Sequence, residues 1–280
     1  VLAAEACGYA CLPEPLVENA GVALPLLAAV APAHPALARA LEGGITIAAG
    51  HPENPFVADA DTAGALLLQR DGALHLVEAD AARLTAQPSV DPFRRLFTVA
   101  FEAGKATRVA DAAQAAPLLA QAFDRGALFA AAQFLGIAQR CVDLAVAYAS
   151  ERQQFGKPIG SYQAVKHHLA TAQVKIEFAR PVLHAAAAAL PQGDLYSRAR
   201  ISHAKLVASE AADLAARDAI QVHGAMGYSW EVDVHFFLKR AIALDTWWGT
   251  PALHRRRVAE RVLAGRLGPE NTFAKEDEDA

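Results

Sequence analysis

Apolar residues recur at intervals of three and four along most of the chain after Pro117. This spacing places side chains on one face of an α-helix, so three successive runs predict three long helices. A fourth helix is predicted to begin at Thr250-Pro251, where a capping residue precedes proline, and to end near Gly265. Four helices with small residues on their inner faces predict a bundle. The three runs are Phe134, Ile137, Cys141, Leu144 and Tyr148; Val165, Leu169, Ala172, Ile176 and Ala179; and Ile201, Ala204, Ala208, Ala211, Ala215 and Val222.

Local signals predict the ends of the second and third helices. Ser161 is expected to cap the second helix. Pro181 is expected to end or kink that helix, because proline lacks an amide N–H. Asp194 is expected to cap the third helix, which is predicted to stop at Gly224.

The chain before the bundle has a different pattern. Short helical pieces, interrupted by two pairs of prolines, are followed by short apolar or alternating runs that predict strands, and Asp71-Gly72 predicts a hairpin turn. The predicted strands include Ile45–Ile47, Ala65–Leu68, Leu74–Val77 and Leu96–Phe101. We therefore predict a mostly α protein with a small β module, divided into a helical segment (1–42), a β domain (43–109), the bundle (110–270) and a flexible acidic tail (271–280).

Composition excludes several classes of function. The net charge is −4 and the basic residues are scattered, so the positive surface that nucleic acid requires is not expected. No apolar run is expected to reach the roughly 18 residues that span a bilayer, and we predict a cytoplasmic protein. Cys7, Cys11 and Cys141 have no spacing typical of a disulfide framework or a zinc site, and no metal is predicted.

Two motifs carry chemistry-bearing residues. The segment 151–160 places Arg152, Phe155 and two glycines at the turn between the first two bundle helices. Arginine can grip a phosphate, phenylalanine can stack on a base, and glycine lets backbone approach a ligand, although an ordinary turn between helices explains the same residues. The second motif, Gln221–Tyr228, ends the third helix in a glycine-rich segment that is also compatible with a purely structural cap.

Together and in this order, the motifs resemble the R-x-x-F-G and Q-x-x-G-G-x-G signatures of acyl-CoA dehydrogenases, and the resemblance extends from about residue 126 to residue 263. It implies an FAD-binding fold, with residues 1–42 as a remnant of the family's N-terminal helical domain. The resemblance also implies cofactor ligands that reach across a subunit interface to the adenosine diphosphate half of a neighbour's FAD. Ala225 departs from the second signature by replacing its second glycine. The implied FAD ligands are Arg152, Phe155, Gln221 and Gly224, with Gln163 as a weaker candidate.

The family's reaction requires a carboxylate that removes the α-proton of an acyl-CoA thioester while a hydride leaves for the flavin. In many members a glutamate precedes the Gly-Thr that opens the last helix, and Trp248 stands there in this sequence. A minority of members place the glutamate on the first bundle helix, where this chain has Gly126. Neither indole nor glycine can accept the proton. Asp124 is two residues from Gly126 and is expected to face away from that position. Asp245 is either a base without precedent in the family or a solvated turn residue.

Contacts to the chain's own flavin also differ from the family pattern. The β module contains no tryptophan where the family carries a Trp-Ile-Thr or Trp-Ile-Ser strand, and Ala252 replaces a glutamine that usually touches FAD. The resemblance therefore implies a non-catalytic subunit of a heterotetramer, sharing FAD with a homologous subunit that carries the glutamate and most of the acyl-CoA site. It also implies an electron-transfer acceptor and, as a bacterial example, a steroid side-chain thioester as substrate. A homo-oligomeric dehydrogenase with Asp245 as base and a non-enzymatic binding protein are the alternatives.

Overall fold

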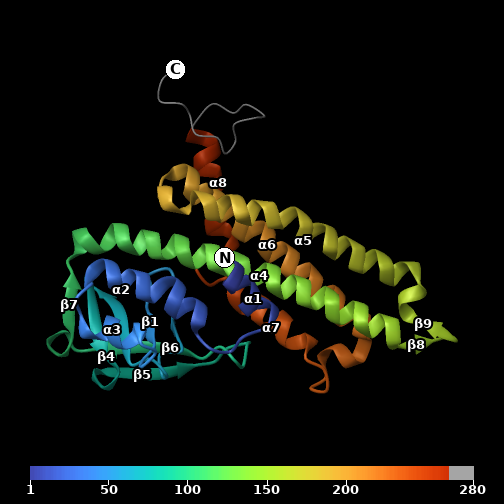
Figure 1. The fold of residues 1–280 in the computed structure, drawn as a ribbon, viewed down its shortest axis with the longest axis horizontal. Coiled ribbons are helices and arrows are strands. Elements are labelled where there is room, and N and C mark those ends of the chain that lie inside the picture. Colours follow the sequence, from blue (N-terminus) through green and yellow to red (C-terminus); the bar gives the residue numbers. More distant parts are fainter. Residues whose placement is uncertain (265–280) are drawn as a thin grey trace. The chain divides into compact units, whose positions relative to one another are not determined.

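A computed structural model describes residues 1–264 and has the mostly helical fold with a small β module that the sequence predicts (Figure 1). The chain divides into two compact units, which we call the bundle unit (Val1–Leu12 with the chain from Ala127 onward) and the β unit (Pro13–Gly126). The predicted tail 271–280 and the predicted helix end near Gly265 lie outside the described residues. The predicted division at residues 42, 109 and 270 remains a prediction.

The β unit combines short helices with two small sheets. Hydrophobic residues of strands β3, β4 and β6 and of the loop between β2 and β3 form a buried cluster that includes Leu66, Leu68, Val77 and Phe97. The helical elements are η1 (Val17–Ala23, a π-helix), α2 (Leu24–Val30), α3 (Pro35–Leu41), η2 (Ala79–Ala81) and η3 (Ala103–Lys105). One sheet has the order β1 (Ile47–Ala49), β3 (Ala65–Arg70), β4 (Ala73–Glu78), β7 (Thr107–Ala110), and the other β2 (Val57–Ala58), β6 (Leu96–Phe101), β5 (Ala82–Gln87).

The hairpin predicted at Asp71-Gly72 is confirmed. Arg70 pairs with Ala73, and the two turn residues have φ angles of 51° and 82°, the left-handed conformation that suits a two-residue hairpin. Strands β2, β5 and β7 were not predicted. The side chains of β5 alternate between half-buried and exposed, with none fully buried, so they give a weak apolar signal.

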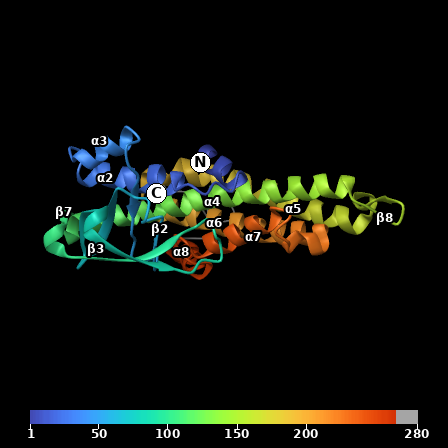
Figure 2. The same ribbon diagram turned by 90° about the horizontal axis from the view of Figure 1, so that it is seen from below.

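The bundle unit is organised around α6 (Leu195–His223), which packs against α5 (Gln163–Ala189), α7 (Val234–Asp245) and α8 (Pro251–Ala264). The part of α4 (Ala112–Glu151) that belongs to the bundle unit runs lengthwise beside α5 and α6 in both views (Figures 1 and 2). The inward face of α6 is mostly alanine and serine, which allows close approach of the neighbouring helices. Its fully buried alanines include Ala199, Ala204, Ala208, Ala211, Ala212, Ala216 and Ala219.

The structure confirms some predicted helix ends and corrects others. The side chain of Asp194 accepts a hydrogen bond from the amide of Ser197 at 2.8 Å, and α6 ends at Gly224 as predicted. Ser161 does not cap α5, because its hydroxyl donates to the carbonyl of Pro158 at 2.7 Å. Pro181 does not end α5, which continues through it to Ala189.

Helices α4 and α7 also differ from the prediction. Helix α4 begins at Ala112, before Pro117, because Asp111 and Gln114 form reciprocal side chain to backbone hydrogen bonds of 2.9 and 3.2 Å at its start. Helix α7 was not predicted, since it has no side-chain cap at Asp233 to mark its start.

The hydropathy of α4 corrects one expectation. An 18-residue window of this helix is long and apolar enough to cross a membrane by composition alone. Within the described protein, 67% of that window is buried, and a core helix of a soluble protein meets the same test. The apolar character of α4 is therefore weak evidence for a membrane span.

Helix α1 (Leu2–Tyr9) is held against α4 by close backbone contact at two glycines. A Cβ atom at Gly136 would lie 2.0 Å from the carbonyl oxygen of Glu5, and one at Gly8 would lie 2.1 Å from that of Gln133. Real Cβ atoms do not approach backbone oxygens so closely. The crossing of α1 over α4 therefore requires glycine at both positions.

Gly136→Ala is expected to destabilise the protein by about 1–3 kcal/mol or more, because the added methyl group forces α1 away from α4. Urea unfolding followed by circular dichroism measures the change. Gly104→Ala is the matched control, since a Cβ there meets no atom within 4 Å. Equal stabilities for the two variants would contradict the close crossing.

Candidate functional site

The first motif forms a small hairpin at one end of the bundle (Figure 1). Strands β8 (Gln153–Gln154) and β9 (Lys157–Pro158) pair around a turn at Phe155 and Gly156, whose φ angles are 51° and 80°. The Phe155 side chain is 92% exposed. Arg152 is also exposed, and within residues 1–264 no carboxylate pairs with its guanidinium. Both predicted nucleotide ligands are therefore available to a partner.

Backbone hydrogen bonds fix the base of this hairpin. The amide of Arg152 donates to the carbonyl of Tyr148 at 2.9 Å, and its own carbonyl accepts from Ile159 at 2.8 Å. Gly160 packs closely on α4, because a Cβ there would lie 3.0 Å from the carbonyl of Ala149. Gln163, the weaker candidate, begins α5 and is exposed beside this hairpin.

The second motif ends α6 and turns into η6 (Gly224–Tyr228). Gly224 has φ 61° and ψ −138°, a conformation that residues with a Cβ rarely adopt. Gly227 has no room for a side chain, because a Cβ would lie 2.6 Å from the carbonyl of Ile220. Gln221, Gly224 and Ala225 are all exposed to solvent.

An aromatic contact brings the two motifs to the same end of the bundle. The rings of Tyr148 and His223 stack with centroids 4.3 Å apart and planes inclined by 24°. Tyr148 lies one turn before Arg152, and His223 directly precedes Gly224. His223 is oriented by its Nδ1, which lies 2.7 Å from the carbonyl oxygen of Ala219. Sequence spacing did not reveal this stack, because 75 residues separate its members.

The segment 245–250 leads from the end of α7 to the start of α8 and is buried at its centre, 247–249. Trp247 and Trp248 are 4% and 2% exposed, so both are core residues. Trp248 has a φ angle of 55°, which is rare for a bulky residue, and Gly249 follows at 96°. Such a conformation persists only where surrounding contacts impose it.

Two side chains supply these contacts. The ammonium of Lys205, on α6 and 2% exposed, donates to the carbonyls of Asp245 at 3.4 Å, Gly249 at 2.5 Å and Trp247. The Nε2 atom of His254 lies 2.8 Å from the carbonyl oxygen of Trp248. No motif in the sequence indicates the role of Lys205, a charged residue on a face of α6 that is mostly alanine and serine.

His254 is neutral in this site. Burial, reinforced by the charge of Lys205, lowers its pKa to about 3. Since a carbonyl only accepts hydrogen bonds, Nε2 carries the proton, and Nδ1 accepts from the hydroxyl of Ser202 at 3.0 Å. The Ser202–His254 pair thus anchors the Trp248 carbonyl from α6 and α8.

Asp245 lines a pocket of about 650 Å³ formed by α5, α6, α7 and α8. Burial raises the pKa of its carboxyl group, while the charge of Lys205 and a hydrogen bond with Ser209 act in the opposite direction. The pocket also contains charges of both signs, including Lys175 and Asp213. Asp245 is thus a half-buried acid rather than the fully solvated turn residue of the simpler interpretation.

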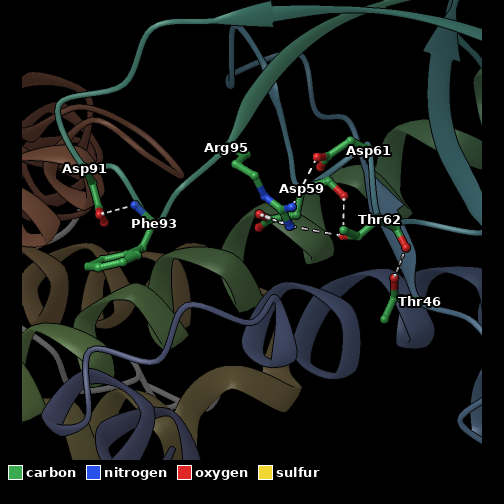
Figure 3. Close-up of polar contacts among 7 residues, drawn as sticks. All are labelled: Thr46, Asp59, Asp61, Thr62, Asp91, Phe93 and Arg95. Carbon is green, nitrogen blue, oxygen red and sulfur yellow. Dashed lines mark hydrogen bonds and ion pairs between the residues drawn. The ribbon is translucent and has the colours of Figure 1, made fainter.

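The β unit contains a second pocket of about 570 Å³, with a mostly apolar wall that includes Pro15 and Phe93. Its polar side is built on Arg95, whose guanidinium lies 3.4 Å from Asp59 and 3.2 Å from Asp61 (Figure 3). Burial raises the pKa of the Asp59 carboxyl group, and Arg94 and Arg95 oppose that rise.

Two threonine hydroxyls join backbone segments that border this pocket. The Thr62 hydroxyl donates to the carbonyl of Asp59 at 3.1 Å, and the Thr46 hydroxyl donates to the carbonyl of Thr62 at 3.1 Å (Figure 3). In the same view Asp91 accepts from the amide of Phe93 at 3.0 Å. The Arg95 guanidinium also donates to the hydroxyl of Thr62, which lines the same pocket, at 3.4 Å.

Sequence comparison identifies the family. A profile described as "Acyl-CoA dehydrogenase, C-terminal domain" matches residues 116–263. The chain is 34% identical over 259 residues to acyl-CoA dehydrogenase IpdE2 of Mycolicibacterium smegmatis, across 92% of this chain and 77% of that protein. The chain belongs to the acyl-CoA dehydrogenase family. Members of this family use FAD.

Solved acyl-CoA dehydrogenases share the fold. The ChsE4-ChsE5 complex of Mycobacterium tuberculosis matches with a TM-score of 0.77 and 23% identity, covering 95% of this chain and 80% of that one. A variant of the Tcur3481-Tcur3483 steroid ACAD matches with a TM-score of 0.75 and 21% identity, covering 92% and 78%. At these identities the likeness supports the acyl-CoA dehydrogenase fold and no finer property.

The two positions at which acyl-CoA dehydrogenases were expected to carry a base are both buried here. Gly126 lies within α4, and Asp124, two residues before it, is 3% exposed. Trp248, in the 245–250 segment described above, is 2% exposed. Among residues 1–264, no group of three or more His, Cys, Asp and Glu side chains could hold a metal.

In the His254→Gln variant, the free energy of unfolding is expected to fall less at acidic pH than it does in the parent protein. The folded protein holds His254 neutral down to about pH 3, whereas the unfolded chain protonates it near 6.5. The contribution of His254 to the free energy of unfolding is therefore complete above pH 6.5. It is lost as the pH falls, by up to about 1.4 kcal/mol per pH unit. Between pH 7 and 5 the variant should lose about 2 kcal/mol less than the parent in urea unfolding.

The matched control is His167→Gln, which replaces an exposed histidine on α5. This control should retain the pH dependence of the parent. An unchanged pH dependence in His254→Gln would show that His254 is not held neutral.

Proposed function

We propose that this chain is the non-catalytic subunit of a heteromeric, FAD-dependent acyl-CoA dehydrogenase. In this account it completes the FAD site of a homologous subunit, and that subunit supplies the glutamate base and most of the acyl-CoA site. The observation that carries the proposal is the contrast between a buried Trp248, at the expected base position, and exposed Arg152 and Phe155.

The absence of a base follows from the chemistry of the side chain. A proton acceptor must lie within hydrogen-bond reach of the substrate's α-carbon proton. The indole of Trp248 has only a donor, and the residue is 2% exposed in the described protein. The other expected position, Gly126, has no side chain at all.

The residues of the two motifs fit the adenosine diphosphate half of FAD. An exposed guanidinium at Arg152 can bind a phosphate through two parallel hydrogen bonds. Phe155 offers an exposed ring for stacking on a base, and Gly224 exposes backbone without a side chain. Bound FAD would supply the hydride acceptor, and this chain's residues would hold its nucleotide end and keep it oriented toward the partner.

The relatives suggest the substrate class and the assembly. One solved structure with this fold is named as a complex of two different chains, and another is named as a steroid ACAD. We propose by analogy a heterotetramer acting on a steroid side-chain CoA thioester, with reoxidation by an electron-transfer protein. Fold likeness by itself does not decide substrate.

Flavin absorbance tests the proposal. The chain is expressed alone and together with a homologous subunit that contains an intact Glu-Gly-Thr. The expected result is a colourless chain alone and a yellow complex after co-expression. No flavin with any partner would instead support a non-enzymatic binding protein.

A second outcome would favour a homo-oligomeric enzyme. The raised pKa of Asp245 and its position in a pocket make it the candidate base for that function. The chain alone would then hold stoichiometric FAD and oxidise an acyl-CoA, and Asp245→Asn would abolish the reaction. Such a result would overturn the proposal that this chain is a non-catalytic subunit.

Arg152→Ala in the co-expressed complex is expected to weaken FAD binding at least about tenfold. A charge-assisted hydrogen bond contributes about 1.5–3 kcal/mol, and about 1.4 kcal/mol corresponds to a tenfold change. Equilibrium dialysis of FAD against the complex measures the dissociation constant. Arg256→Ala is the matched control, because Arg256 is also exposed and pairs only with Glu260 at 3.8 Å on the same helix among the described salt bridges. Unchanged FAD affinity in Arg152→Ala would contradict the role of this arginine.

A further inference from the structure

The backbone carbonyls of the 245–250 segment converge on side chains from two helices. Those of Asp245, Trp247 and Gly249 accept hydrogen bonds from Lys205 of α6, and that of Trp248 accepts from His254 of α8. Four carbonyls within five residues thus point into the bundle. We call this arrangement the carbonyl cage.

The cage matches the chemistry of a lysine ammonium. This group has three N–H donors and no acceptor, and three carbonyls of the cage receive them. A buried charge is tolerated when hydrogen bonds replace its water, and Lys205 is 2% exposed. The neutral imidazole of His254 completes the set without adding a second buried charge.

The cage also accounts for the backbone of Trp248. Its φ angle of 55° is unfavourable for an L-residue, so the free segment would not select it. Binding of the flanking carbonyls of Trp247 and Gly249 to one atom fixes the chain direction on both sides of Trp248. The cage thus restrains the backbone on both sides of Trp248, whose side chain is 2% exposed.

We propose that Lys205 is the positioning residue of this segment, and that its ammonium keeps Trp248 sealed at the position where the family carries its base. This inference rests on the proposed function only where it equates position 248 with the position of the family's catalytic base. Its physical content is that the segment closes around Lys205, so the position stays inaccessible to an acyl-CoA substrate.

Intrinsic fluorescence tests this inference without a partner. The chain has three tryptophans, so Trp230→Phe leaves Trp247 and Trp248 as the sole reporters. Trp230 is 75% exposed, and its replacement removes the solvent-exposed emission. In this background, Lys205→Met should shift the emission to longer wavelength and increase acrylamide quenching at least about threefold, because the unpaired carbonyls turn toward water.

A graded series separates positioning from general destabilisation. Lys205→Gln retains N–H donors and should give an intermediate shift, whereas Lys175→Met, which removes an exposed lysine of α5, should give none. Far-UV circular dichroism establishes that each variant is folded. Should Lys205→Met fail to fold, Ser202→Ala tests the same segment by weakening the His254 anchor and should give a smaller shift in the same direction.

Folded Lys205 variants with the parent's emission wavelength and quenching would overturn the inference. That result would bear on the 245–250 segment and not on the proposed function. A failure of the proposed function would appear separately, as absence of flavin in the complex made with the unsubstituted chain.

Discussion

Helix α6 packs closely against three other helices, and this packing sets the geometry of the bundle. Its inward face is mostly alanine and serine, so neighbouring helices approach with little side-chain volume between them. Lys205 is the buried cation on that face, and the 245–250 segment supplies carbonyl oxygens that replace its water. A single helix thereby determines the shape of the segment at the expected base position.

The same helix carries, at its other end, the motif for which we propose nucleotide binding. Lys205 and Gln221 are separated by sixteen residues of continuous helix, or about 24 Å at 1.5 Å per residue. His223, which stacks on Tyr148, ties that end to the hairpin containing Arg152. The two regions have separate contacts, so the cage around Trp248 and the exposed residues of the two motifs coexist in one chain. The proposed subunit, which binds nucleotide without catalysing, requires this separation.

Elements with local signals could be predicted from the sequence, and those that depend on distant contacts could not. The Asp71-Gly72 hairpin and the Asp194 cap are encoded in adjacent residues, and both were predicted correctly. Pro181 was predicted to end or kink α5, yet the helix continues through it to Ala189. At the site, the motif residues were visible in sequence, but the Tyr148–His223 stack and the carbonyl cage join residues far apart in the chain. No local pattern reports such contacts.

The proposed flavin site belongs to a pair of unlike subunits, one of which is this chain. The ratio of FAD to protein in the purified co-expressed complex measures whether the site is shared. One flavin is expected for each pair of unlike chains, with none in this chain when it is purified alone. One flavin in every chain, together with oxidation of an acyl-CoA by this chain alone, would contradict it.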